Sequence, residues 1–394
     1  MSKALQIISK SCGHEVRPGE FIMLKPDYLL GHDAGIAPAI PILNELGGDL
    51  YDPSRIIVVM DHFVPAPSEE IAKYHKSIRA WIGKKGINNF FEVGCGVCHQ
   101  VLLDEGFAAP GKIIAGADSH TPTCGAVGAL GIAIGVTELA VAMTTGEIWI
   151  MVPDTIYFNL HGVLPSGSTA KDLALHIIKS IKDLSIQVNY KSVEFIGAGL
   201  NTLSVGDRAT LCNMMAEAGV KTALISPDEG DIAGSYDICL DDISPLVAVP
   251  YSPENVESVS EVDVSIDQAY LGSCTNGRIE DLRTAATILE GKKIHPDVRM
   301  LVSPASNKVF RQAVNEGLVD VLADAGAMFI GCACGACFGA HMGLLAEGER
   351  CISSTNRNFP ARMGHAKSEV YLASPATVAA SAITGKITDP RGFV

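Results

Sequence analysis

Short apolar runs alternate with amphipathic stretches along this chain. Residues 55–60 form an apolar, β-branched run that stops at Asp61, which predicts a buried parallel strand with polar residues at its carboxyl end. Residues 69–86 have helical periodicity, and the preceding Ser68 is a residue type that caps helices well. Further elements are expected as strands over 89–93, 112–115 and 155–160, and as helices over 3–12, 169–184 and 206–218. Alternating strands and helices are typical of a parallel sheet covered on both faces, so the predicted fold class is α/β.

Two segments depart from this alternation. Residues 126–152 form the most apolar stretch, but Glu138 and Glu147 interrupt it, so a buried helical region is expected there rather than a membrane span. Residues 251–261 are polar and include Pro253, which predicts a linker. At 394 residues the chain exceeds the size of a single hydrophobic core. Three domains are therefore expected, over residues 1–153, 154–255 and 256–394.

Composition narrows the function classes. Hydrophobic residues make up 47% of the chain and charged residues 19%, which suits a well-buried globular enzyme and excludes a disordered chain. The formal net charge is −14, and such an acidic chain is a poor partner for nucleic acid, because phosphate contacts need a basic surface. The sequence has eleven cysteines and no secretory signal after Met1, so reduced thiols in the cytoplasm are expected.

Three cysteines stand among small residues. Cys274 lies in Gly-Ser-Cys-Thr-Asn-Gly, and Cys334 and Cys337 lie in Gly-Cys-Ala-Cys-Gly-Ala-Cys. Small neighbours allow backbone amides to approach whatever the sulfur atoms bind. Three thiolates are one fewer than a closed zinc site or a fully ligated cubane cluster needs. One metal position would then stay open, and an open position is where substrate chemistry happens.

The spacing of these cysteines leaves several chemistries open. Cys334 and Cys337 would also suit a zinc knuckle or a redox dithiol. Zinc lacks a second matched Cys or His pair, and a redox dithiol leaves Cys274 unexplained. An iron–sulfur cluster is the favoured interpretation, and zinc, redox chemistry and simple burial remain as alternatives. Cys332 is interpreted as a buried or nearby thiol, because ligands at both ends of a Cys-x-Cys are awkward for one cluster.

Carboxylates and imidazoles follow the ends of predicted strands. Asp61 and His62 follow the first of these strands, and Asp118 and His120 follow the strand over 112–115. His99 stands directly after Gly-Val-Cys at 96–98. Such groups can serve as acids, bases or water-holding groups. The alternative for each one taken singly is a turn cap or a structural histidine.

Two other segments add polar candidates. Asn213 and Glu217 lie four residues apart, on one face of the helix expected over 206–218. Arg357 and Arg362 lie in a stretch from Cys351 to Ser368 that has no acidic residue. Two arginines in such a loop could bind substrate carboxylates through paired hydrogen bonds, and the alternative is a solvated basic loop.

Together these segments resemble the aconitase family of iron–sulfur hydro-lyases, over nearly the whole chain. The matching motifs are Met-Asp-His at 60–62, Gly-Val-Cys-His-Gln at 96–100, Gly-Ala-Asp-Ser-His-Thr at 116–121, Cys-Asn-Met-Met-Ala-Glu at 212–217, Gly-Ser-Cys-Thr-Asn-Gly at 272–277, Cys-Gly-Ala-Cys at 334–337 and Asn-Arg-Asn-Phe-Pro-Ala-Arg at 356–362. Within the family the chain is most similar to the large subunits of the 3-isopropylmalate dehydratase and homoaconitase group. The resemblance implies three-layer α/β/α domains around one [4Fe–4S] cluster, in a chain that lacks the C-terminal swivel domain.

The resemblance also implies roles for individual residues. It assigns the cluster to Cys274, Cys334 and Cys337. Proton transfer is implied for Asp61, His62, His99, Asp118, His120 and Glu217, with His62 protonating the leaving hydroxyl. Contacts with the substrate or beside the cluster are implied for Ser119, Asn213, Asn356, Arg357 and Arg362.

A partner is implied as well. In the family the swivel domain supplies a serine base, a further substrate arginine and the residues that select the substrate. A separate small subunit is therefore expected to supply them, and the chain alone is expected to be inactive or nearly so. No partner nucleic acid and no membrane are expected.

The expected substrate is 3-isopropylmalate, and a homoaconitate or a 2,3-dimethylmalate or citramalate-type acid is the rival. A glutamine expected near the first helix of aconitases has no evident counterpart in residues 32–37, which makes aconitase activity itself less favoured. Two readings from other classes are an RNA-binding, cluster-sensing protein on the same scaffold and a zinc-stabilised structural partner. The acidic balance of the chain disfavours the first.

Overall fold

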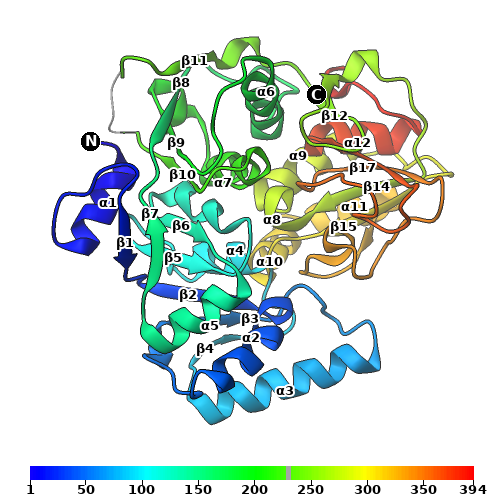
Figure 1. Ribbon diagram of the computed structural model, residues 1–394. Coiled ribbons are helices and arrows are strands. Elements are labelled where there is room, and N and C mark those ends of the chain that lie inside the picture. The colour runs from blue at the N-terminus through cyan, green and yellow to red at the C-terminus, as the bar shows by residue number, and fades with distance from the viewer. Residues whose placement is uncertain (228–231) are drawn as a thin grey trace.

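The computed structural model describes residues 1–227 and 232–394 and contains three main sheets (Figure 1). The first sheet has the order β4-β3-β2-β5-β6, and all its strand pairs are parallel. Its strands are β2 (Tyr28–His32), β3 (Ile56–Val59), β4 (Asn89–Phe91), β5 (Ile113–Gly116) and β6 (Leu130–Ala133). In Figure 1 this sheet lies at the lower left, with α3 along the bottom of the molecule.

Helices cover both faces of the first sheet. They are α2 (Asp33–Glu45), α3 (Glu69–Lys85), α4 (Cys98–Asp104), α5 (Val136–Thr145) and the 3₁₀ helix η2 (Thr121–Val127). Ile56 and Val58 of β3 pack with α2, α3 and α5, whereas Ile57 and Val59 pack with α4 and η2. Successive side chains of a strand point to opposite faces, so a strand buried on both faces is apolar at every position. The arrangement is a three-layer α/β/α unit, as predicted.

The helix and strand predicted around Asp61 are confirmed. The helix begins after Ser68, whose hydroxyl accepts a hydrogen bond from the backbone of Ile71, and it ends at Gly86 in a left-handed conformation. Glu69 and Glu70 stand in its first turn, where negative charge favours the helix dipole.

The second sheet has the order β10-β9-β8-β11 and is parallel throughout. Its strands are β8 (Thr155–His161), β9 (Ser192–Ile196), β10 (Thr222–Ile225) and β11 (Tyr236–Cys239). Helices α6 (Ala170–Asp183) and α7 (Val205–Met214) pack on it, and η4 (Met215–Ala218) continues α7 as a 3₁₀ turn. The single helix predicted over 206–218 therefore tightens in its last turn.

The third sheet has the order β13-β12-β18-β17-β14-β15-β16. Its strands are β12 (Leu246–Ala248), β13 (Val256–Ser258), β14 (Gln268–Gly272), β15 (Arg299–Ser303), β16 (Met328–Phe329), β17 (Arg350–Ser353) and β18 (Glu369–Ala373). Only β12 runs antiparallel to its neighbours among these described strands. Helices α9 (Ile279–Leu289), α10 (Asn307–Asn315), α11 (Leu318–Ala325) and α12 (Pro375–Thr384) cover one face.

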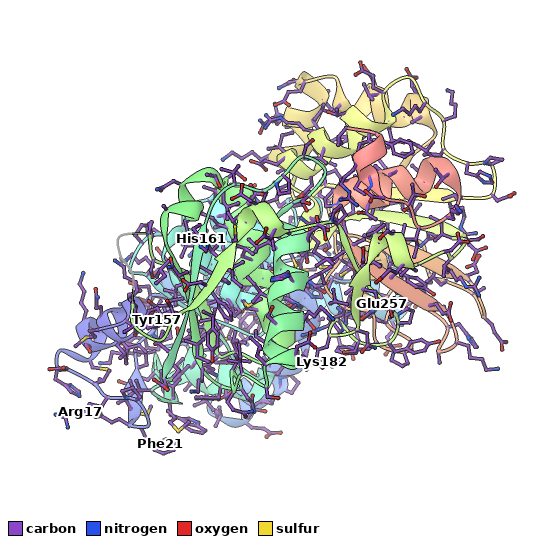
Figure 2. All side chains as sticks on the ribbon, turned by 90° about the horizontal axis from the view of Figure 1, so that it is seen from above. Arg17, Phe21, Tyr157, His161, Lys182 and Glu257 are labelled. Atoms are coloured by element: carbon purple, nitrogen blue, oxygen red, sulfur yellow. The ribbon has the colours of Figure 1, made fainter. Side chains whose placement is uncertain are left out.

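The second and third sheets share one hydrophobic core. Side chains of α6 and α7 pack in the same cluster as Phe158 of β8 and Tyr270 of β14. Seen from above, the green second unit lies over the blue first unit and beside the yellow-to-red third unit, with Lys182 of α6 on the side toward the third (Figure 2). The α6–α7 layer therefore joins the second sheet to the third.

Two sequence expectations are wrong in detail. The apolar stretch 126–152 is not one helical region, because β6 and β7 (Ile148–Met151) flank α5 within it. Periodicity cannot separate a buried strand from a buried helix in a continuous apolar run. The segment 251–261 is not a simple linker, because it contains β13 and the 3₁₀ helix η6 (Val259–Glu261). Since β12 already pairs with β18, we propose that the third domain begins at β12 rather than at residue 256.

A small ribbon lies at the periphery. Strand β1 (Phe21–Leu24), which follows α1 (Lys3–Cys12), pairs antiparallel with β7. Phe21 stacks on Trp149 with ring centroids 6.3 Å apart, at the outer edge of the molecule (Figure 2). Within the described part of the chain, no helix combines the length and apolarity that crossing a membrane requires.

A buried lysine ties α6 to the third sheet. Lys171 is fully buried, and its ammonium donates hydrogen bonds to the carbonyl of Ser354, at 3.0 Å, and to the carbonyl of Thr355. Burial lowers the pKa of Lys171 to about 8, although nearby acidic groups, Cys337 and Asp281 among them, oppose that change. The two carbonyls follow β17, so α6 fixes the start of the loop that carries the motif arginines.

Replacing Gly125 with alanine should destabilise the protein by about 1–3 kcal/mol, the usual cost of overpacking. A Cβ at Gly125 would lie 1.7 Å from the backbone oxygen of Ala223, which cannot swing away. Gly83→Ala in α3 is the control, because a Cβ there meets open space among the described residues. Thermal unfolding by circular dichroism should show a lower Tm for Gly125→Ala and an equal or higher Tm for Gly83→Ala. An unchanged Tm for both variants would contradict this packing.

The stability of the wild type relative to Lys171→Met should rise with pH between about 8 and 10.5. The folded pKa of about 8 lies below the reference value of 10.5, so in this window the unfolded chain binds a proton that the folded chain has released. Above this window the amine is neutral in both the folded and the unfolded chain, and the gain in folding free energy is complete. The gain is lost as the pH falls through about 8, where the folded chain also takes up the proton. The shift corresponds to about 3 kcal/mol. Anaerobic urea unfolding at several pH values measures it, with the exposed Lys179→Met as control, and a pH-independent difference would refute the assignment.

Candidate active site

A cavity of about 260 Å³ lies where the strand ends of the first and third sheets meet. Ligands bind at the carboxyl ends of parallel strands in open α/β sheets. The predicted residues that line it are Asp61, His62, His99, Asp118, Ser119, His120, Cys274, Cys334, Cys337, Asn356, Arg357 and Arg362. Asn213 and Glu217, the other two predicted residues, contact this lining from α7 and η4.

The cysteine loops are held by specific backbone contacts. Cys274 is the second residue of α8 (Ser273–Asn276), which directly follows β14, and Arg278 donates to its carbonyl at 2.5 Å. Only glycine fits at Gly272, the last residue of β14, because a Cβ there would lie 2.4 Å from the carbonyl oxygen of Ser303. Cys334 donates its N–H to the carbonyl of Asp61 at 3.0 Å, which ties the second cysteine loop to the first sheet.

The three sulfur atoms are suited to a shared metal group. Cys274, Cys334 and Cys337 are all buried and line one cavity. The side-chain amide of Asn213 donates to the sulfur of Cys274 at 3.3 Å, and that of Asn356 does so at 3.6 Å. Amide donors of this kind stabilise metal-bound thiolates and tune cluster potential. The residues present therefore fit an iron–sulfur cluster.

Burial keeps the thiols of Cys274 and Cys334 protonated until metal binds. It raises the pKa of Cys274 to about 12, with the nearby Cys337 acting in the same direction. It also raises the pKa of Cys334. A metal must displace these protons, so its binding releases acid. Cys332 also has a pKa raised by burial to about 12, but it lies outside the lining of the cavity that the described residues form.

His62 sits between two carboxylates. Its Nδ1 lies 2.7 Å from Asp61, and its Nε2 lies 3.3 Å from Asp118. Asp61 in turn accepts a hydrogen bond from the backbone N–H of Cys98 at 2.6 Å. Burial opposes a charge on His62, but the neighbouring Asp61, Cys334 and Asp118 raise its pKa well above the ordinary value.

Asp118 lies near four histidines, of which His62, His99 and His120 are the nearest and His32 is 3.7 Å away. It lies 2.9 Å from the Nε2 of His99 and 3.5 Å from the Nδ1 of His120, in addition to its contact with His62. The backbone N–H of His120 also donates to it at 2.7 Å. Burial alone would raise the pKa of Asp118, but the three nearest histidines hold it well below its ordinary value. The carboxylate is therefore charged.

Glu217 joins His120 to Arg357. Its carboxylate lies 2.7 Å from the Nε2 of His120 and accepts a hydrogen bond from Arg357 at 2.9 Å. Burial works against its charge, but these two partners lower its pKa. Burial lowers the pKa of His120, but its hydrogen bonds with Asp118 and Glu217 raise the pKa, and the net effect is an increase. Arg357 also donates to the hydroxyl of Ser119 at 2.9 Å.

Arg362 is the second cationic group at the cavity. Its guanidinium lies 5.8 Å from the centre of the Phe338 ring. Its Nε is buried and has no hydrogen-bond partner among the described residues. A buried donor without a partner is costly, and an anionic ligand would satisfy it.

His32 is a site residue that the sequence analysis missed. It ends β2 and stacks on His62 with ring centroids 3.9 Å apart. Its Nε2 bonds the carbonyl of Ala117 at 2.9 Å, and its buried Nδ1 lacks a partner within the described chain. Burial and the charge of His62 lower its pKa. The available signal in the sequence was its position at the end of a strand, next to Asp33. Two polar residues at a strand end are common in proteins, so without a motif around them they do not indicate a site.

Comparisons with known proteins agree with this geometry. A model of the aconitase family (aconitate hydratase) matches residues 6–236 and 235–385. The proteins of this family carry an iron–sulfur cluster. The crystal structure of the holo form of Thermococcus kodakaraensis aconitase X is similar in fold, with a TM-score of 0.54 and 11% identity, over 93% of this chain and 97% of that one.

Curated relatives match over their full length. The chain is 44% identical to "3-isopropylmalate dehydratase large subunit 1" of Methanopyrus kandleri, over 99% of both chains. It is 45% identical to "3-isopropylmalate dehydratase large subunit" of Aquifex aeolicus, over 99% of this chain and 96% of that one. It is 44% identical to "3-isopropylmalate dehydratase large subunit 1" of Pyrococcus furiosus, over 100% of this chain and 99% of the other. These names imply a small-subunit partner for each relative. The chain belongs to the aconitase family.

Proposed function

We propose that this chain is the cluster-bearing large subunit of a two-subunit hydro-lyase that isomerises 3-isopropylmalate to 2-isopropylmalate. The proposal rests on a single cavity. Its lining brings together three buried cysteines, Asp118 with its three nearest histidines, and two arginines. The names of full-length relatives support the choice of substrate. The eleven thiols all lie in the described residues and are free, which suits a reducing compartment such as the cytoplasm.

We assign one [4Fe–4S] cluster to Cys274, Cys334 and Cys337. When bound, it supplies an iron without a protein ligand, a Lewis acid for the substrate hydroxyl and a carboxylate. Asn213 and Asn356 hold the sulfur of Cys274 by their amide groups.

The two arginines bind the carboxylates of the substrate. The guanidinium of Arg362 brings a buried Nε that needs an acceptor, and Arg357 presents the donors that Glu217 and Ser119 leave free. Paired hydrogen bonds from guanidinium to carboxylate fix the orientation of a planar acid. Ser119 turns its hydroxyl toward the same ligand.

Histidine–carboxylate pairs move the protons at oxygen. His62 holds a proton between Asp61 and Asp118, and it delivers this proton to the departing hydroxyl, which leaves as water. His99 and His120 keep Asp118 charged and the water in place. Loss of the carbon-bound proton completes the elimination, and addition of water to the other carbon of the enoate gives the regioisomer.

The base that takes the carbon-bound proton belongs to the partner in this proposal. The small subunit covers the cavity with its swivel domain and supplies a serine base and the loop that selects the substrate. Homoaconitate and 2,3-dimethylmalate or citramalate-type acids are the alternative substrates, because this selection is made on the partner.

The substrate assignment is tested with the anaerobically co-purified pair of subunits. Formation and consumption of the enoate are followed for 3-isopropylmalate, homoaconitate, 2,3-dimethylmalate, citramalate and citrate. The highest kcat/KM is expected for 3-isopropylmalate, and the large subunit alone should show little or no turnover. A higher kcat/KM for another acid would move the assignment to that acid. Robust activity of the isolated, cluster-loaded chain would refute the shared active site.

The cluster assignment is tested by metal analysis of cysteine variants. About four irons and four sulfides per chain are expected for the anaerobically purified wild type. Cys274→Ser, Cys334→Ser and Cys337→Ser should each lose most of the iron, because each removes one of three protein ligands. Cys332→Ser is the matched control from the same loop and should keep the wild-type content. About one zinc per chain instead would overturn the assignment.

A further inference from the structure

The backbone around His62 is held from behind by a buried carboxylate. Asp33 is the first residue of α2 and is only 2% exposed. One of its oxygens accepts a hydrogen bond from the backbone N–H of His62 at 2.9 Å, and the other accepts one from that of Phe63 at 2.8 Å. A single side chain therefore binds two consecutive amides of the loop that follows β3.

His75 completes this arrangement from a third element. It lies on α3, is 4% exposed, and its Nε2 is 3.2 Å from the second oxygen of Asp33. Because a carboxylate only accepts, the imidazole donates this bond. Burial opposes the charge on Asp33, but His75, His62 and the two amides hold its pKa well below the ordinary value. The carboxylate of Asp33 is therefore charged near neutral pH.

Asp33 and His75 lie outside the lining of the candidate active-site cavity that the described residues form. Both line a separate cavity of about 410 Å³ between α2 and α3, together with apolar residues such as Pro38 and Tyr74. The catalytic cavity is lined instead by His62 itself. Asp33 and His75 therefore act on the chemistry through the backbone of the loop, and Asp33 also acts through its charge, because it interacts electrostatically with His62.

The rest of the loop is anchored independently. The side chain of Asp61 accepts from the N–H of Cys98, and its carbonyl accepts from the N–H of Cys334. These contacts fix Asp61 but leave the next two backbone amides to Asp33. The position of the His62 ring, between Asp61 and Asp118, requires both anchors at once.

We propose that His75 and Asp33 form a positioning pair for His62, which holds the loop amides so that its imidazole stays aligned with the departing hydroxyl. The inference rests on the proposed role of His62 as proton donor. Misplacement of a catalytic group by about 1 Å can cost on the order of 10²-fold in rate. Loss of the pair should therefore lower kcat by about 10- to 100-fold, whereas KM should change by less than about threefold because the carboxylate-binding arginines are untouched.

Three variants separate positioning from simple stability. His75→Phe removes the donor but keeps a ring of similar size, and His75→Gln restores an N–H donor. Asp33→Asn places an amide NH₂ where one of two backbone N–H groups needs an acceptor. Glu194→Gln is the matched control, because Glu194 is also a fully buried carboxylate that accepts from two consecutive backbone amides, those of Lys3 and Ala4, but belongs to the second sheet.

The experiment combines kinetics of the two-subunit holoenzyme with hydrogen–deuterium exchange of peptides that contain residues 62 and 63. In His75→Phe and Asp33→Asn we expect the fall in kcat, an iron content equal to wild type, and faster exchange at these two amides. His75→Gln should recover most of both signals. Glu194→Gln should keep wild-type kcat and exchange in the loop, even if its Tm falls.

The outcomes are distinguishable. If His75→Phe keeps kcat within twofold of wild type, or if His75→Gln fails to recover it, the pair does not position His62. If Asp33→Asn does not fold, the two His75 variants still decide the question. If the wild type turns over none of the tested acids, the proposed function fails, and the exchange rates then decide whether the pair holds the loop: equal protection in wild type and His75→Phe would overturn the inference.

Discussion

One carboxylate, with 11% of its side chain exposed, organises the candidate active site. Asp118 follows β5 and is approached by His62, His99 and His120, which come from three separate segments around the first sheet. A charged carboxylate without such partners would cost several kcal/mol in this largely buried position. Each histidine must therefore keep its place for the others to be stable. The strand order, with β2 between β3 and β5, brings these segments close enough for that to happen.

The second sheet links the chemistry of the other two. Glu217 reaches His120 across 97 residues of sequence and Arg357 across 140. His120 of the first unit and Arg357 of the third unit therefore both contact the carboxylate of Glu217, which lies on η4. Lys171 strengthens the same junction, because its ammonium satisfies two carbonyls just before Asn356. The cavity consequently exists only when all three units are assembled.

The cysteine loops are arranged to receive a metal group before it binds. The thiols of Cys274 and Cys334 are buried and hard to ionise, so these two sulfur atoms carry no negative charge before metal binds. The amides of Asn213 and Asn356 already point at the sulfur of Cys274, which prepares the loop for a thiolate. Preparation of this kind costs little, because the same amides also bond hydroxyls of Thr123 and Thr275.

Periodicity, caps and short motifs are local properties, so the sequence alone is enough to predict the strand at 56–59, the helix after Ser68 and the motif residues that line the cavity. It did not separate β6, α5 and β7 within 126–152, because an apolar run buried on all sides has no polar face to reveal its period. Only the tertiary structure identified His32, the Asp33–His75 pair and the role of Lys171. These are buried polar groups whose partners lie 42 to 184 residues away, and no local pattern records which distant donor a carboxylate or carbonyl will meet. Packing of the three sheets decides that, since it alone places the strand ends and helix faces opposite one another.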